Sequence, residues 1–372
     1  MAPDGRQIAH MTAPMIAQFL PLIVACLFAG LLGFAAHRAS ICTVRAVAEI
    51  MSARSAHMLW SIAKSALWVI ALTLPFFWLV PAAAAGIGGW QVTAATFLGG
   101  FLFGLGAAIN GACAYSTMAR LADGEVRMAV TIGGFAVGVV TFLALVDLQW
   151  LARPAKAPAL LGSVLTFALL VSAVLLIWAL YEVPRIWRHR PRHLNLKHMI
   201  LAPQYRLSTA ALVIGIASAV IFLLIGTPGY TITLQNLVQV VVGMGEFPAA
   251  RGFIVLAVLA GMLVSTLQRG SFRFDWRPQR SWLRNVFGGA MMGLGGAMVP
   301  GGNAVLVLYA SPSFSPHALP GLAALIVGAG AGLLAMKHIG GVDTRVVCAN
   351  DIYRAEAQPR GSILNSHRPT RG

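Results

Sequence analysis

Charged residues are scarce in this 372-residue chain, and acidic residues are the scarcest of them. Asp, Glu, Lys and Arg together make up 10% of the sequence, and only 11 residues are acidic. A soluble domain normally carries about 25% charged residues. The apolar residues, 58% of the chain, fall in runs of about 20, which is long enough to cross a hydrocarbon core of roughly 30 Å. A soluble globular protein is excluded, and a protein that crosses the membrane many times is predicted.

Cysteine is also rare. The four cysteines, Cys26, Cys42, Cys113 and Cys348, form no CxxC pair and no metal-ligand spacing, so neither a disulfide framework nor a metal site is predicted. No carboxylate falls in the middle of an expected span, which argues against a proton pump built on buried Asp or Glu. The sequence contains no nucleotide-binding motif and no cofactor signature. We therefore predict no cofactor and no enzymatic activity.

Basic residues outnumber acidic ones and give a formal net charge of +16, with 23 arginines among the 27 basic residues. Such a balance can indicate nucleic-acid binding, but here the charges lie in short loops between the apolar runs. Membrane topology and contact with anionic lipid headgroups explain them better. No nucleic-acid partner is predicted.

The apolar runs predict an all-α fold with about nine transmembrane helices. They cover 15–36, 59–80, 91–121, 128–148, 159–181, 208–226, 251–268, 285–310 and 318–336. Alternating them across the membrane places 22 of the 27 Lys and Arg residues on one side and four on the other. Because the cytoplasmic side carries the excess of Lys and Arg, the N-terminus is predicted outside and the C-terminus in the cytoplasm.

The two halves of the sequence resemble each other. GGFLFGLGAAINGA (99–112) matches GGAMMGLGGAMVPG (288–301) without a gap, at an offset of 189. Residues 129–138 have a looser partner at 319–328, and 31–42 align loosely with 224–233 at an offset near 191. Since a single span joins the halves, the second is inverted relative to the first, as in many transporters.

This repeat defines the predicted organisation of the chain. The segment 227–250 is expected to be a re-entrant half-helix, because both its ends lie outside and it is too short to cross the membrane twice. The segment 40–53 is expected to be its counterpart on the cytoplasmic side. The tail is basic and rich in Pro and Ser, and is predicted to be disordered. The predicted parts are an N-terminal segment (1–14), a first repeat (15–148), a linking helix with a basic cytoplasmic loop (149–207), a second repeat (208–336) and the tail (337–372).

Four helix breaks are expected to face one another in the middle of this arrangement: 37–42, 110–113, 226–229 and 300–303. Breaks at membrane depth persist only where protein or a hydrated cavity covers them, and the free N–H groups at a half-helix N-terminus attract anions. Asn110 and Asn303 could cap helix starts or donate to a solute. Glycines such as Gly111 and Gly302 let the backbone approach a ligand closely.

Two of the cysteines adjoin these breaks. Cys113 follows the second break, and Cys42 lies at the start of the first predicted half-helix, after Ser40. A thiol there is soft and suited to contact with sulfur, although a buried cysteine can equally serve as a small apolar residue. We assign that second role to Cys26, and no role to Cys348.

The motifs RASIC (38–42), NGACAYSTMARLADG (110–124) and VPGGNAVLVLYASPSFSPHA (299–318) resemble those of the YeeE/YedE family of sulfur-transport membrane proteins. The resemblance implies a bacterial inner-membrane protein with re-entrant helices that takes up thiosulfate or a related sulfur compound. It also implies a possible cytoplasmic partner, because some relatives work with TusA-like or rhodanese-like sulfur carriers.

In the thiosulfate transporters of this family, cysteines along the central path contact the substrate. Cys42 and Cys113 match two of those positions, whereas the break at 300–303 contains no cysteine, so a relay of three thiols is not available. The substrate-binding residues that we predict are Ser40, Cys42, Asn110, Gly111, Cys113, Gly302 and Asn303. Two alternatives stay open: a membrane protein that relays thiol-bound or persulfide sulfur to a cytoplasmic carrier, and a subunit that anchors a sulfur-handling partner through the tail.

Overall fold

A computed structural model describes residues 5–80, 88–158, 165–188, 201–276, 281–339, 341–349 and 351–359. Within them, nine helical segments are long and apolar enough to cross a membrane, which confirms the predicted all-α, multi-pass class. These segments are Phe19–Ala53, His57–Phe77, Ala94–Ala122, Arg127–Asp147, Leu170–Arg188, Leu207–Val241, Ala249–Arg269, Trp282–Ala310 and Ala318–His338.

Four of these nine segments consist of a longer helix, a break and a shorter helix. The pairs are α1 (Gly5–Ala39) with α2 (Thr43–Ala53), α5 (Ala94–Asn110) with α6 (Ala114–Ala122), α10 (Leu207–Ile225) with α11 (Tyr230–Val241), and α13 (Ser281–Met298) with α14 (Asn303–Val305). The last pair continues into a π-helical turn, η2 (Leu306–Ala310). All four predicted breaks are confirmed.

The other five segments are single helices: α3 (His57–Leu79), α7 (Arg127–Asp147), α8 (Leu165–Arg188), α12 (Ala249–Arg269) and α15 (Ala318–His338). The predicted link between the halves contains α8, while its residues 189–200 lie outside the described part of the chain.

The halves pack against each other reciprocally. Helix α7 of the first half packs on α13 of the second, and α15 of the second packs in the same way on α5 of the first, while α5 and α13 also contact each other. Likewise α1 contacts α12 and α10 contacts α3. Exchanging the halves therefore converts each contact into another contact of the structure, as a two-fold relation requires.

Close helix contacts at glycines show the same relation between the halves at single residues. A Cβ on Gly104 would lie 2.0 Å from the backbone oxygen of Leu325, and a Cβ on Gly293 would lie 2.0 Å from that of Phe135. Gly293 lies 189 positions after Gly104, and Leu325 lies 190 positions after Phe135. The offset found between the sequence halves thus relates equivalent contacts. The offset differs at the first break of each half. Cys42 and Gly229, which precede α2 and α11, lie 187 positions apart, whereas the sequence alignment suggested an offset near 191 there.

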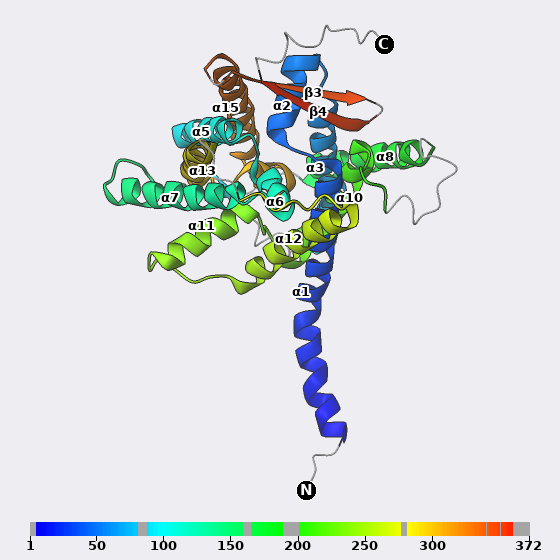
Figure 1. The fold of residues 1–372 in the computed structure, drawn as a ribbon. Helices are drawn as coiled ribbons and strands as arrows, with labels where there is room; N and C mark the ends of the chain where they lie inside the picture. The colour runs from blue at the N-terminus through cyan, green and yellow to red at the C-terminus, as the bar shows by residue number, and fades with distance from the viewer. Residues whose placement is uncertain are drawn as a thin grey trace.

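The described residues also form two small antiparallel sheets. One joins β1 (Gly88–Trp90) to β2 (Lys156–Pro158), and the other is a hairpin of β3 (Val342–Ala349) and β4 (Ile352–Pro359). Figure 1 shows the hairpin beside α2, at the opposite end of the molecule from the start of α1.

The hairpin shows that the prediction of a disordered tail was wrong for 342–349 and 352–359. Ser52 on α2 accepts from the backbone N–H of Val346 at 3.2 Å. At the hairpin turn, the backbone oxygen of Asp351 accepts from the N–H of Leu207 at 2.8 Å, and its carboxylate accepts from the N–H of Ser208 at 3.2 Å. Asp351 thereby satisfies free N–H groups at the start of α10. Composition could not reveal contacts with elements so distant in sequence.

The structure buries two carboxylates toward the ends of helical segments, where the expectation of no carboxylate in mid-span made no prediction. Glu182 lies inside α8, which extends beyond the predicted end at 181, and forms an ion pair with Lys64 at 2.5 Å. Glu49, within α2, accepts from Ser55 and from the backbone N–H groups of 57 and 58, which begin α3. Both carboxylates therefore have protein partners, and these contacts offset the free-energy cost of burying a charge.

Candidate functional site

The starts of the four short helices lie close together. The residues that precede them are Cys42, Cys113, Gly229 and Gly302, each with an extended backbone conformation. None of the four supplies a side-chain hydrogen bond to its helix. The first-turn N–H groups are therefore not satisfied by capping side chains, and their partial positive charge favours an anion.

Direct contacts connect these starts to one another. The thiols of Cys42 and Cys113 lie close enough to interact, at the starts of α2 and α6. Asn303 at the start of α14 donates from Nδ2 to Thr43 Oγ1 on α2 at 3.0 Å. The N–H of Gly302 donates to Thr231 Oγ1 on α11 at 3.1 Å. The breaks that the sequence predicted to face one another thus meet at one place.

The first half places a thiol before each of its short helices, and the second half places a glycine at each equivalent position. A Cβ on Gly229 would lie 2.1 Å from Val305 Cγ2, so a side chain there has no room. The site is consequently asymmetric in chemistry although its helices are paired symmetrically, and both sulfur atoms belong to the first half.

Both thiols are buried and free. Cys42 and Cys113 are each 1% exposed, and neither forms a disulfide. The Cys113 sulfur lies near the backbone N–H groups of Thr43 and Ser116, and the Cys42 sulfur lies near that of Arg45. These donors are first-turn N–H groups of α2 and α6, so each sulfur lies where the helix starts concentrate partial positive charge.

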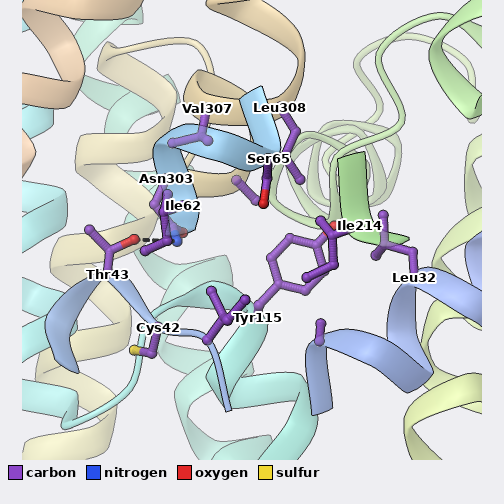
Figure 2. Close-up of a pocket in the computed structure, with 13 residues that line it drawn as sticks. Leu32, Cys42, Thr43, Ile62, Ser65, Tyr115, Ile214, Asn303, Val307 and Leu308 are labelled. Atoms are coloured by element: carbon purple, nitrogen blue, oxygen red, sulfur yellow. Dashed lines mark hydrogen bonds between the residues drawn. The ribbon is translucent and has the colours of Figure 1, made fainter. Parts of the chain in front are cut away.

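A cavity of about 50 Å³ adjoins Cys42. Figure 2 shows Cys42, Thr43 and Asn303 on one side of it, with Ser65 and Tyr115 also contributing to its wall. The rest of the lining is apolar: Leu32, Ala36, Ile41, Ile62, Ile214, Ala304, Val307 and Leu308. A cavity of this size has room for a water molecule or a few non-hydrogen atoms.

One polar atom at this cavity has no partner. Asn303 Oδ1 is buried and accepts no hydrogen bond from the described residues. The Thr43 hydroxyl can donate as well as accept, so turning the Asn303 amide would keep their mutual bond and direct the two N–H donors to the free position. Leaving a buried polar atom unsatisfied costs free energy, and a solute in the cavity would remove that cost.

Asn110 has a different environment from Asn303. Its Nδ2 donates to the backbone oxygen of Ala112 at 3.0 Å and to Thr117 Oγ1 at 3.2 Å. Its Oδ1 accepts from Thr131 at 2.8 Å and from Asn285 at 3.1 Å. Every polar side-chain atom of Asn110 thus has a protein partner, and the amide ties the end of α5 to α6, α7 and α13.

The remaining predicted residues lie at the edge of the site or outside it. Gly111 is exposed and ends α5 with a φ of 75°, and it is absent from the lining of the Cys42 cavity. Ser40 lines a second cavity, which shares Ile41 and Tyr115 with the first. The structure therefore brings together Cys42, Cys113, Gly302 and Asn303 and leaves Ser40, Asn110 and Gly111 around them.

Sequence reasoning missed Thr43 and Tyr115. Thr43 directly follows Cys42, and Tyr115 lies two positions after Cys113, so both lie in the first turn of a short helix. Their closeness to the breaks was a usable signal, but the direction of their side chains was not readable from sequence. Arg38, the first residue of the RASIC motif, is 1% exposed, donates to Ser265 and Gln268, and stacks 4.6 Å from the centroid of the Phe34 ring.

In the described residues, nine apolar spans, four of them interrupted by breaks whose helix starts meet, define a multi-pass membrane protein with a central cluster of half-helix N-termini. A family model for sulphur transport matches residues 38–331, which include all four breaks. The chain belongs to this sulphur-transport family, the YeeE/YedE family that the motifs resembled. A search of curated proteins finds no match.

Proposed function

We propose that the protein takes up thiosulfate or a related inorganic sulfur anion through the point where the four short helices meet. The observation that carries this proposal is the pair of buried, free thiols of Cys42 and Cys113, in contact with each other at two helix starts. A sulfur transporter needs a place that favours negative charge and also accepts sulfur. The helix starts provide the first property, and the polarisable thiols provide the second.

In this mechanism the solute exchanges hydrogen bonds with the thiols as it passes. Its sulfur replaces one thiol in the Cys42–Cys113 contact and then the other, so no covalent bond needs to form or break. First-turn N–H groups balance the charge, and the Asn303 amide donates to the solute's oxygens. Because the break at 300–303 contributes no thiol, Gly302 and Asn303 would bind the solute through backbone and amide groups alone.

The proposal includes an orientation and a set of partners. We place the protein in the bacterial inner membrane with its N-terminus outside, since 22 of the 27 basic residues then face the cytoplasm. The sulfur compound would pass to a cytoplasmic TusA-like or rhodanese-like carrier. We propose transport rather than catalysis, either passive or coupled to an ion gradient.

Uptake by variants in which one cysteine at a time is replaced by alanine tests the proposal. Cells that lack other thiosulfate uptake systems and express the wild type should accumulate labelled thiosulfate, and parallel assays with sulfite and selenite define the range of solutes. Cys42→Ala and Cys113→Ala should each lower uptake by about tenfold or more, because each removes a partner from a buried contact. Cys26→Ala is the matched control, since Cys26 lies on α1 away from the breaks. Unchanged uptake of every solute in both variants would refute the thiol path.

A persulfide relay is the second candidate, and the same thiol–thiol contact favours it. A persulfide on Cys113 could transfer its outer sulfur to the Cys42 thiolate, which leaves a thiolate on Cys113 and a persulfide on Cys42. Alkylation followed by mass spectrometry of protein taken from transporting cells separates the candidates. A persulfide mass on either cysteine supports the relay, and unmodified thiols during active uptake support the hydrogen-bonded path.

A further inference from the structure

A second cavity lies next to the thiol cavity and differs from it in chemistry. It also measures about 50 Å³, and three residues, Ala36, Ile41 and Tyr115, line both cavities. Figure 2 shows the Tyr115 side chain directed into the first cavity. We call the second cavity the vestibule; its other lining residues are His37, Ser40, Arg45, Ser116, Ala119, Arg120, Asp123, Met262 and Arg269. The lining changes from apolar to strongly polar on crossing Ile41 and Tyr115.

Three arginines from three separate elements line the vestibule: Arg45 on α2, Arg120 on α6 and Arg269 at the end of α12. Arg120 forms an ion pair with Glu125 at 2.8 Å. Arg45 donates to the backbone oxygen of Ser40 at 3.2 Å. The Arg45 guanidinium is thus held at the vestibule by a neutral carbonyl oxygen, which does not cancel its charge.

The carboxylate that lines the vestibule does not offset these charges fully. Asp123 Oδ1 accepts from Thr266 at 3.1 Å and from Ser271 at 2.9 Å, and it lies 3.1 Å from His37 Nε2. Burial raises the pKa of Asp123, but its hydrogen bonds, that with His37 first, outweigh this and lower the pKa below its ordinary value. Because Glu125 already pairs with Arg120, Asp123 is the one lining carboxylate that faces Arg45 and Arg269, and an anion would complete the cluster.

We propose that the vestibule is a second binding site for the transported sulfur oxyanion, in which Arg45 and Arg269 hold its oxygens and the Ser40 and Ser116 hydroxyls donate to it. This inference rests on the proposed function. Guanidinium groups bind oxyanions through paired N–H donors, whereas thiols suit the softer sulfur end. The two cavities thus recognise the two ends of such a solute on either side of Ile41 and Tyr115.

Binding and uptake of labelled thiosulfate, together with binding of labelled sulfate, test the inference in purified protein and in cells. Sulfate presents oxygens without a terminal sulfur, so it probes the vestibule rather than the thiols. Arg45→Gln combined with Arg269→Gln should weaken sulfate binding and raise the thiosulfate KM by about tenfold or more, because each removes a charged donor. Arg45→Lys keeps the positive charge and loses the paired N–H donors of the guanidinium, so it should have a smaller effect. Because it is a conservative change, it also shows whether loss of binding comes from a folding defect.

The control is Arg273→Gln, an exposed arginine on the loop after α12 that does not line the vestibule. Wild-type sulfate affinity in the Arg45 and Arg269 double variant would overturn the inference. Cys113→Ala should retain sulfate binding while losing uptake; if it loses uptake and the double variant keeps a normal KM, the vestibule inference alone fails. If the wild type neither binds nor moves any sulfur oxyanion, the proposed function fails too.

Anionic lipid headgroups share this chemistry, and the bilayer composition distinguishes the two sources. Sulfate affinity should be the same in nanodiscs of zwitterionic lipid and in nanodiscs that contain phosphatidylglycerol. Sulfate binding that disappears in the anionic nanodiscs would identify the vestibule as a headgroup site and overturn the inference.

Discussion

At the scale of single residues, position relative to a helix break separates residues of the same type. Cys42 and Cys113 precede short helices and contact each other, while Cys26 lies within α1 and Cys348 in β3. This difference was readable from sequence, because glycine, proline and small polar residues mark the breaks. That the two thiols touch was not readable, since it depends on how α2 and α6 pack.

The two asparagines show where sequence reasoning fails. Asn110 and Asn303 both adjoin breaks and were given the same role, yet Asn110 has all its polar atoms paired and Asn303 keeps a free oxygen. The partners of Asn110 include Thr131 and Asn285, which are 21 and 175 positions away. Satisfaction of a buried amide is a property of tertiary packing, so local sequence could not assign it.

The thiol contact predicts selective oxidation at the residue scale. In a variant with Cys26→Ala and Cys348→Ala, the oxidant diamide should convert Cys42 and Cys113 to a disulfide and be reduced to the hydrazine. Because the bond would join α2 to α6 across the proposed path, uptake should fall and dithiothreitol should restore it. Peptide mass mapping detects the cross-link. Full oxidation without a 42–113 disulfide would show that the two sulfurs do not meet.

At the scale of elements, the sequence predicted where helices end better than what surrounds them. All four breaks lie where the sequence indicated. Three of them contain glycine or proline, which act locally, while the first contains Ser40 in a left-handed conformation with a φ of 52°. The hairpin β3–β4 and the extension of α8 past Glu182 were missed, since each is stabilised by a distant partner: α2 and α10 for the hairpin, Lys64 for Glu182. Local propensity is overridden where tertiary contacts satisfy polar groups.

Close packing of α5 on α15 gives a prediction at this scale. Gly104→Ala should destabilise the protein by roughly 1–3 kcal/mol or more, because its Cβ would lie 2.0 Å from the backbone oxygen of Leu325. Gly133→Ala on α7 is the matched control, since nothing lies within 4 Å of the added Cβ and alanine favours a helix by up to about 1 kcal/mol. Thermal unfolding in detergent measures both. Equal midpoints would contradict the helix contact.

At the scale of the whole molecule, reciprocal contacts between the halves account for a site that neither half could form alone. The first half supplies the thiols, and the second supplies Asn303, whose amide bonds to Thr43 of the first. A duplication followed by divergence would account for helix starts that stay paired while their residues differ. The asymmetry would also give the proposed path a direction, because the vestibule arginines gather beside the first-half thiols.

Inversion of the second half within the membrane is the last consequence of this architecture, and it is testable from outside the cell. The turn between α2 and α3 corresponds to the segment between α11 and α12, so the two should lie on opposite sides. Ala56 and Glu246 are exposed in these positions. In a background with Cys26→Ala and Cys348→Ala, Glu246→Cys should react with an impermeant maleimide on spheroplasts, and Ala56→Cys only after the membrane is opened, since the positive-inside rule places its basic flank in the cytoplasm. Labelling of both from the same side would mean that the halves are parallel and that the predicted inverted repeat is wrong.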